Sequence, residues 1–434
     1  MSKPTGNLGA RAPGGWTRRD ATHLLWRTQF GASETEIARA TRDGLANTLD
    51  RLLSPQPESD EFQATEPLLR EAAFNSGGIG DLKAWWLHRM HYTANPLRER
   101  LTLLWHNHFA TSNAKVRSVP AMAAQNDLFR RESLGSFRRL LHGMAKDVAM
   151  LIWLDSNANR KRHANENFAR EVMELFSLGE GNYTEDDIKQ AARAFTGWHV
   201  RDDAFWFNQL QHDNRNKTLF GKTQNLDGGD VVDLCLAHEA CPRYLAYKLL
   251  RAFVLESPST KLIGALAARI REHDFEMAPV MHELLSSKIF YSRAARHAVI
   301  KSPVQLVLGT FRALGGRPNL QAAGQLMAQL GQDIFEPPTV KGWEGGRLWI
   351  TSATLLQRSN FVAALLNDKL GILDEPAKNP KADTVFYTEL LLARDVPETR
   401  ARLEKYFTTA SGSRDERLRG LLHLVMTLPE FQLT

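Results

Sequence analysis

The residue types best suited to chemistry cluster between Trp105 and Lys217, and the first group is Trp105-His106-Asn107-His108-Phe109. Residues two apart on a helix point in nearly opposite directions, so His106 and His108 share one ion only where the helix ends before them. His108 lies on the same face as the preceding leucines and is either a core histidine or part of a site. We expect His106 to be a catalytic candidate, with Asn107 as a ligand-binding neighbour.

A second group, residues 155–166, has the spacing of a calcium-binding loop, with oxygen ligands alternating along it and a glutamate at its end. Its sixth position is Arg160, where glycine normally makes the sharp turn, and three basic residues lie inside it. Two interpretations therefore stay open. Either Asp155 and Glu166 bind a divalent cation, or the segment connects two helices and is held by hydrogen bonds of its asparagines.

A third group lies on a predicted helix that begins near Asn165. Asn167, Glu171 and Glu174 fall within roughly 60° of one another around its axis. This stripe is either a solvated face with an ion pair along the helix, or one wall of a site in which paired carboxylates bind a cation or share a proton. In the second interpretation Glu171 is a metal ligand and Glu174 an acid or base. Asn165 and Asn167 are then ligand-binding residues.

A fourth group consists of His212, Asp213 and Lys217, in a segment without helical periodicity. A histidine beside an aspartate can act as an acid–base pair, and the lysine that follows can bind an anion. An ordinary turn accounts for the same residues equally well. If a site forms here, His212 and Asp213 are the catalytic candidates and Lys217 is the ligand-binding candidate.

The segments that must position these groups have mostly helical periodicity. We therefore predict a mainly α fold, with one large multi-helix globular domain over residues 17–434. Ser33, followed three residues later by a glutamate, predicts a capping box, and Thr184 opens another helix in the same way. Asn95-Pro96 predicts the start of a helix that continues to about Phe109.

Three segments depart from the helical pattern. Residues 1–16 are rich in glycine and proline and predict a disordered N-terminus. Residues 54–80 predict a polar linker. Residues 198–227 carry aromatic side chains among turn-forming residues, and this pattern predicts a small irregular or β-hairpin insertion.

The composition limits the function classes. The chain has 434 residues, of which 43% are hydrophobic and 24% charged, as in an ordinary globular protein. The net charge is +6, but the basic residues are interspersed with acidic ones, so nucleic acid is not the expected partner. Two cysteines are too few for a disulfide framework. No stretch is apolar enough to span a bilayer and the N-terminus lacks an apolar signal region, so we expect a cytoplasmic protein.

Three long motifs and one short one give the sequence a family resemblance. The sequence resembles the domain-of-unknown-function 1800 family of bacterial proteins in WHNHFATS at 105–112, NENFAREVMELFSLGEGNYTEDDIKQAARAFTGW at 165–198, HD at 212–213 and PPTVKGWEGG at 337–346. The resemblance implies one large helical domain and brings no established reaction. It also implies a sulfatase-like protein, encoded nearby, as a partner. Members are often exported, whereas this chain lacks a clear export signal.

Two hypotheses for function follow. The first is an enzyme that performs hydrolysis or group transfer with a divalent cation, Ca²⁺, Mg²⁺ or Mn²⁺, because oxygen ligands suit these ions. Its metal ligands would be Asp155, Glu166 and Glu171, and its acid–base residues His106, Glu174, His212 and Asp213. The alternative is a non-catalytic helical protein that binds a partner or assembles a complex, with the polar residues forming a buried hydrogen-bond network. Binding of a polyanion is a third and weaker hypothesis.

Overall fold

The fold is mainly helical, as predicted. The computed structural model describes residues 8–9, 15–367, 371–372, 384–392 and 396–434, so most of the segment predicted to be disordered lies outside the described residues. The first helices are α1 (Arg18–Thr28), α2 (Glu34–Leu53), α3 (Asp60–Ser76), α4 (Ile79–Tyr92), α5 (Pro96–His108), α6 (Asn113–Val116) and α7 (Val119–Glu132).

The middle of the chain contains the short strands. Its elements are α8 (Phe137–Ala145), α9 (Val148–Trp153), the 3-10 helix η1 (Ser156–Ala158), α10 (Glu166–Met173), the π-helix η2 (Glu174–Leu178), α11 (Glu185–Ala194), β1 (Trp198–Arg201), β2 (Ala204–Phe207), η3 (Gln209–Gln211), β3 (Lys217–Leu219), β4 (Lys222–Gln224) and α12 (Gly228–Ala237). The pairs β1–β2 and β3–β4 are both antiparallel. They confirm the predicted hairpin insertion.

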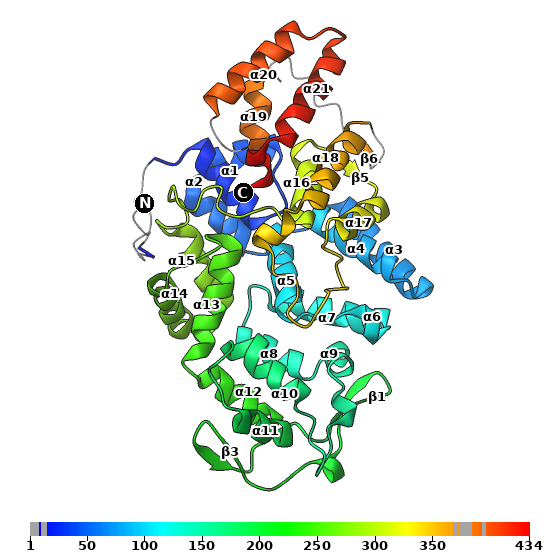
Figure 1. Ribbon diagram of the computed structural model, residues 1–434, viewed down its shortest axis with the longest axis vertical. Coiled ribbons are helices and arrows are strands. Elements are labelled where there is room, and N and C mark those ends of the chain that lie inside the picture. Colours follow the sequence, from blue (N-terminus) through cyan, green and yellow to red (C-terminus); the bar gives the residue numbers. More distant parts are fainter. Residues whose placement is uncertain (1–7, 10–14, 368–370, 373–383, 393–395) are drawn as a thin grey trace.

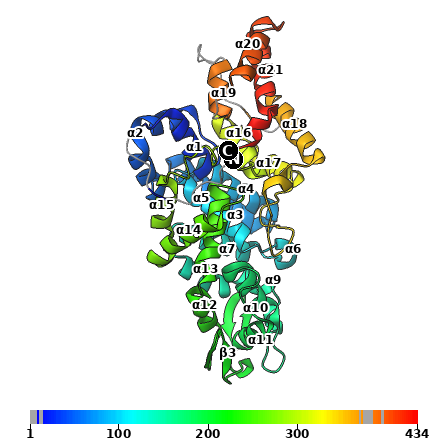
Figure 2. The same cartoon turned by 60° about the vertical axis from the view of Figure 1, so that its left-hand side comes forward.

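The remaining elements return to helices. They are α13 (Ala240–Phe253), α14 (Thr260–Glu272), α15 (Met277–Ser286), α16 (Pro303–Ala313), β5 (Arg317–Pro318), α17 (Leu320–Gln329), η4 (Gly346–Trp349), α18 (Ser352–Leu366), β6 (Gly371–Ile372), α19 (Thr384–Leu392), α20 (Pro397–Thr409), α21 (Arg414–Thr427) and η5 (Pro429–Gln432). Figure 1 shows an elongated molecule with α19–α21 at one end and the two hairpins at the other. Figure 2 shows α5 near the middle, with α13 beside it.

Local sequence signals set many of the helix starts. Ser33 and Thr184 each form the capping box that their sequence context predicts. The prediction of a linker over residues 54–80 is wrong, because α3 occupies most of it. Ser59 caps that helix by accepting a hydrogen bond from the Phe62 N–H, and Phe62 buries its ring. The prediction was wrong because α3 carries many charged residues and only a narrow apolar stripe, so its helical periodicity is weak.

Helix α5 joins the two hydrophobic cores of the molecule. Leu101 and Trp105 belong to a core that extends through α7–α15, whereas Leu103 belongs to a core formed with α1, α4 and α16–α21. Because α5 contributes to both, it helps to fix the two halves relative to each other, as do α1, α2, α7 and α9. In the described part of the chain, no helix combines the length and the hydrophobicity needed to cross a membrane.

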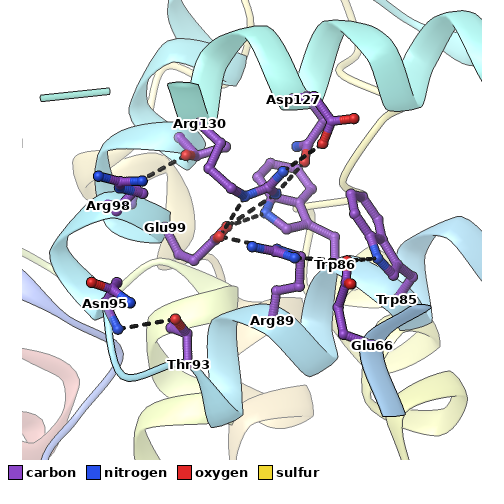
Figure 3. Close-up of polar contacts among 12 residues, drawn as sticks. Glu66, Trp85, Trp86, Arg89, Thr93, Asn95, Arg98, Glu99, Asp127 and Arg130 are labelled. Atoms are coloured by element: carbon purple, nitrogen blue, oxygen red, sulfur yellow. Dashed lines mark hydrogen bonds and ion pairs between the residues drawn. The ribbon is translucent and has the colours of Figure 1, made fainter. Parts of the chain in front are cut away.

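A buried ionic network around Glu99 fixes α5 against its neighbours (Figure 3). The Glu99 carboxylate accepts hydrogen bonds from Arg130 at 2.5 Å, from Arg89 at 3.2 Å and from the Trp86 indole at 2.9 Å. Glu66 extends the network by binding Arg89 at 2.6 Å. Burial alone would raise the pKa of Glu99, but the two guanidinium groups hold it below its usual value. The network therefore ties α3, α4, α5 and α7 together.

Glu99→Gln should destabilise the protein strongly. The substitution leaves Arg89 and Arg130 buried without their shared carboxylate, which typically lowers the free energy of unfolding by about 3–5 kcal/mol. Urea denaturation measures the change. Glu61→Gln on the exposed face of α3 is the matched control and should be near neutral. Equal stability of the two variants would show that the network does not hold these helices.

Candidate functional site

The last turn of α5 anchors three distant segments of backbone. The His106 Nε2 accepts a hydrogen bond from the Phe335 N–H at 3.0 Å. The Asn107 amide accepts from the Trp343 N–H at 2.7 Å and donates to the Trp343 C=O at 3.1 Å. The His108 Nε2 donates to the Phe176 C=O at 3.0 Å.

These contacts place the two histidines inside the protein. His106 is fully buried against aromatic rings, and burial lowers the pKa of each imidazole to about 3, so both are neutral. Their bonds run to different segments, so the pair does not converge on one ion. The structure places His106 in the core and Asn107 at the edge of a cavity.

Asn107 holds the segment 337–349, here named the pocket loop. This segment includes the PPTVKGWEGG motif and closes over α5. Gly342 has a positive φ of 74°, and a Cβ atom there would collide with the side chain and backbone of Asn107. Gly346 also has a positive φ, and a Cβ atom there would collide with the Glu256 carboxylate. The glycines of the motif therefore allow the loop to approach α5 and the end of α13 closely.

The pocket loop, α5 and α13, together with residues 299–305 and Gln332, line an open cavity of about 570 Å³, here named the cationic cavity. Its charged lining residues are Arg100, Lys248, Arg251, Glu256, Lys341, Glu344 and Arg347. Aromatic side chains complete the wall at Tyr244, Trp343 and Trp349. Five cationic side chains thus face two carboxylates, which makes the cavity attractive to an anion.

Arg100 is the most deeply buried cation of the cavity. Only 8% of the residue is exposed, and the guanidinium makes one long hydrogen bond of 3.5 Å, to the Ala252 C=O, and lies 5.4 Å from the centre of the Phe253 ring. Its Nε has no hydrogen-bond partner, and no described carboxylate pairs with it. Burial lowers the pKa of Arg100 to about 10, so the group stays charged at neutral pH. A charged group buried without a counterion is costly, and this points to a missing anionic partner.

Lys248 lies on α13 and also faces the cavity. Among the described residues it makes no hydrogen bond or ion pair, and its ammonium group lies 5.1 Å from the centre of the Tyr244 ring. Burial, with a smaller contribution from Arg251, lowers the pKa of Lys248 to about 8. Its charge is therefore not compensated by the protein.

A carboxylate pair lies close to the cavity, at the junction of α10 and η2. Glu174 accepts a hydrogen bond from the Tyr183 hydroxyl at 2.5 Å. Burial and the nearby Glu174 charge raise the pKa of Glu171 to about 7, against the opposing charge of Lys341. Lys341 and the neighbouring Leu175 line the cavity, so the pair lies near it, although neither carboxylate belongs to its lining. The adjoining π-helix is a form that occurs frequently at functional sites.

The polar groups of the calcium-like loop, residues 155–166, form ion pairs and hydrogen bonds within the protein. Asp155 is exposed and pairs with Lys115 at 2.8 Å, and Glu166 pairs with Arg170 at 3.3 Å. Asn165 accepts a hydrogen bond from the Asn167 N–H, and the Asn167 amide donates to the Leu154 C=O. Asp155, Glu166 and Glu171 are not brought together, and no described group of three such side chains is placed to bind a metal ion.

The fourth predicted group also forms structural contacts. His212 donates from Nδ1 to the Thr196 C=O at 2.8 Å and does not bond to Asp213. The Asp213 carboxylate binds Arg215 at 2.6 Å and Arg193 at 2.9 Å, which holds its pKa far below the usual range. Lys217 donates to the Leu226 C=O at 2.7 Å. These bonds fasten the hairpin segment to α11 and its surroundings.

The two central cations of the cavity were missed in the sequence, although each left a signal. Arg100 follows Leu97 by three residues, and Lys248 follows Leu245 by three, so each cation lies on an otherwise apolar helix face. A cation on such a face indicates either an ion pair or a site. The partner that decides between them is not visible in sequence.

Gly342→Ala should open the pocket loop. The added Cβ atom would force the loop away from Asn107. Gly221→Ala is the control, because Gly221 also has a positive φ, of 76°, but has open space where the Cβ atom would lie. We expect Gly342→Ala to lower the free energy of unfolding by about 1–3 kcal/mol more than Gly221→Ala. It should also accelerate limited proteolysis within residues 337–349. Equal effects of the two substitutions would show that the close approach to α5 is unimportant.

Comparison with known proteins gives a family and no function. The model of a family described as protein of unknown function (DUF1800) matches residues 23–433. Searches of the curated proteins and of the solved structures found no match. The family match covers every element that forms the cationic cavity, including α5, α13 and the pocket loop. It confirms the resemblance seen in the motifs, and the chain belongs to the DUF1800 family.

Proposed function

We propose that the cationic cavity binds a small organic anion and that the protein acts on this anion as an enzyme of hydrolysis or group transfer. The observation that carries the proposal is the pair Arg100 and Lys248, which line one cavity without carboxylate partners among the described residues. A bound anion would be the counterion of these two cations. The volume of the cavity lies in the range of small-molecule sites.

Arginine at the centre favours an oxyanion. A guanidinium group presents parallel N–H donors that match carboxylate, phosphate and sulfate groups. The Trp343 and Trp349 rings in the wall provide apolar surface for the body of an organic ligand. These features together favour an anionic group carried on an organic body.

Glu171 is the acid–base residue of the proposal. A carboxyl group with a pKa of about 7 is present in both protonation states at neutral pH, as general acid–base catalysis requires. Glu174, three residues later, keeps the pair from being fully ionised. The acid–base role predicted for Glu174 therefore goes to Glu171 in this proposal, and Glu174 raises the pKa of Glu171.

A non-catalytic binding protein is the second candidate. Trp206 and Phe207 on β2 and the 91%-exposed Leu210 present apolar surface to solvent, which is typical of a partner-binding site. Under this candidate the anion would be carried or sensed without being changed. Turnover of a bound anion into a product, followed by mass spectrometry, separates the two candidates.

Arg100→Gln should abolish anion binding without destabilising the ligand-free protein. Sulfate or phosphate should raise the melting temperature of the wild type, and a site occupied at 100 times its Kd adds about 2.7 kcal/mol. Both anions also stabilise proteins non-specifically, so the comparison is with Arg98→Gln on the same helix, at equal ionic strength. The control should respond like the wild type. An unchanged anion response in Arg100→Gln contradicts the proposal.

Glu171→Gln should remove a defined pH dependence of stability. The raised pKa means that the protonated carboxyl is favoured in the folded state, so its contribution is fully present below about 4.5 and is lost as the pH rises through about 7. The melting temperature of the wild type should therefore fall relative to Glu171→Gln between pH 5 and pH 8, a range chosen around these values. If the melting temperatures of the wild type and Glu171→Gln change in parallel over that range, Glu171 does not have the raised pKa that the proposal requires.

A divalent cation is a further part of the proposal, because two adjacent carboxylates attract Ca²⁺, Mg²⁺ or Mn²⁺. If such an ion binds at Glu171 and Glu174, EDTA should lower the melting temperature of the wild type and leave Glu171→Gln unchanged. Metal analysis of the purified protein accompanies the measurement. Metal-free protein that melts identically with and without each ion would remove the cation from the mechanism.

A further inference from the structure

Lys248 differs from the other cations of the cavity in its chemistry. Arg100, Arg251 and Arg347 carry guanidinium groups that do not lose their charge near neutral pH. Lysine, in contrast, becomes a nucleophile when its ammonium group loses a proton. Lys248 lies half-buried on α13 and lines the cavity, and no described side chain or carbonyl accepts a hydrogen bond from it.

The groups around Lys248 disfavour its charged form. Those on its own helix are Tyr244, Tyr247 and Arg251. Those on the other walls are His108, Arg100 and Glu256, together with Lys341, Glu344 and Arg347 of the pocket loop. His108 is neutral, and Arg251 lies on the next turn of the helix as a like charge. Glu256 contacts the Arg347 N–H rather than Lys248. A lysine with a cationic neighbour, an aromatic ring and no bound carboxylate has the environment of an activated amine.

We propose that Lys248 is the nucleophile for an aldehyde or ketone carbonyl of the bound anion, so that the substrate class is a small oxo acid or a related anionic carbonyl compound. The inference rests on the proposed anion site, because Arg100 would hold the anionic end while the carbonyl reaches Lys248. Both side chains line the same cavity, and the inference requires a ligand that contacts both.

The chemistry is a condensation. The lone pair of the neutral Nζ attacks the carbonyl carbon, the C=O π pair moves to oxygen, and the proton leaves Nζ for that oxygen through solvent. The resulting carbinolamine loses water, and a C=N bond replaces the C=O bond. No oxidant or reductant takes part, and the imine so formed withdraws electrons for a subsequent group transfer.

The lowered pKa supports a reactive amine. With a pKa of about 8 instead of 10.5, the neutral fraction of Lys248 at pH 7 is roughly 300 times that of an ordinary lysine. Part of that advantage is lost because a less basic amine is a weaker nucleophile. We therefore expect modification at pH 7 to be roughly tenfold faster at Lys248 than at the exposed Lys222.

Trapping with cyanoborohydride tests the inference on the full chain. The wild type is incubated with glyoxylate, an anionic aldehyde, or with glycolaldehyde, its neutral counterpart, and peptide mapping locates the reduced adduct. We expect one carboxymethyl group on Lys248 with glyoxylate, much less reaction with glycolaldehyde, and competition by sulfate. Lys248→Arg keeps the positive charge and should lose the adduct. Arg100→Gln should react with both aldehydes equally slowly.

The outcomes separate this inference from the proposed function. Glyoxylate adducts spread over surface lysines, with Lys248 no faster than Lys222, would overturn the nucleophile even if sulfate still stabilises the wild type through Arg100. Equal labelling of Lys248 by the two aldehydes would overturn the assignment of an anionic carbonyl substrate. If the wild type shows neither stabilisation by sulfate nor preferential labelling of Lys248 by glyoxylate, both the anion site and the inference are rejected.

Discussion

Asn107 exchanges two hydrogen bonds with the backbone of Trp343, and the histidines on either side of it bind the backbones of Phe335 and Phe176. This one helical turn therefore fixes the pocket loop and the π-helix relative to α5. Side chains that pair with backbone groups across such distances leave unsatisfied polar groups when they are removed. The cationic cavity depends on these bonds, because the pocket loop is one of its walls.

Glu99 and Arg100 are consecutive buried charges on α5, and they differ in whether the protein supplies a partner of opposite charge. Glu99 is matched by Arg89, Arg130 and an indole N–H, so its charge is fully used within the protein. Arg100 is nearly as deeply buried, yet among the described residues it has only a distant carbonyl and the Phe253 ring, and no carboxylate. A fold that satisfies one buried charge so completely and leaves its neighbour unsatisfied has the arrangement expected of a binding site.

The sequence reveals the helices and the hairpin insertion because these follow local rules. The capping boxes at Ser33 and Thr184 and the start of α5 at Pro96 are read directly from residue type and spacing. The role of a polar group is different, since it depends on its partner. The amides and histidines that stood out between Trp105 and Lys217 mostly bind distant backbone groups, and no local pattern distinguishes this use from catalysis.

The cavity itself was beyond the reach of sequence reasoning. Arg100 and Lys248 come from helices far apart in the chain, and only the tertiary structure brings them to one cavity. Glu171 was identified as a candidate, but its raised pKa arises from burial and from Glu174 beside the cavity. A crystal structure of the protein grown in selenate tests this account most directly. We predict an anomalous peak within hydrogen-bonding distance of the Arg100 guanidinium, and a carboxylate of the chain bound there instead would contradict the account.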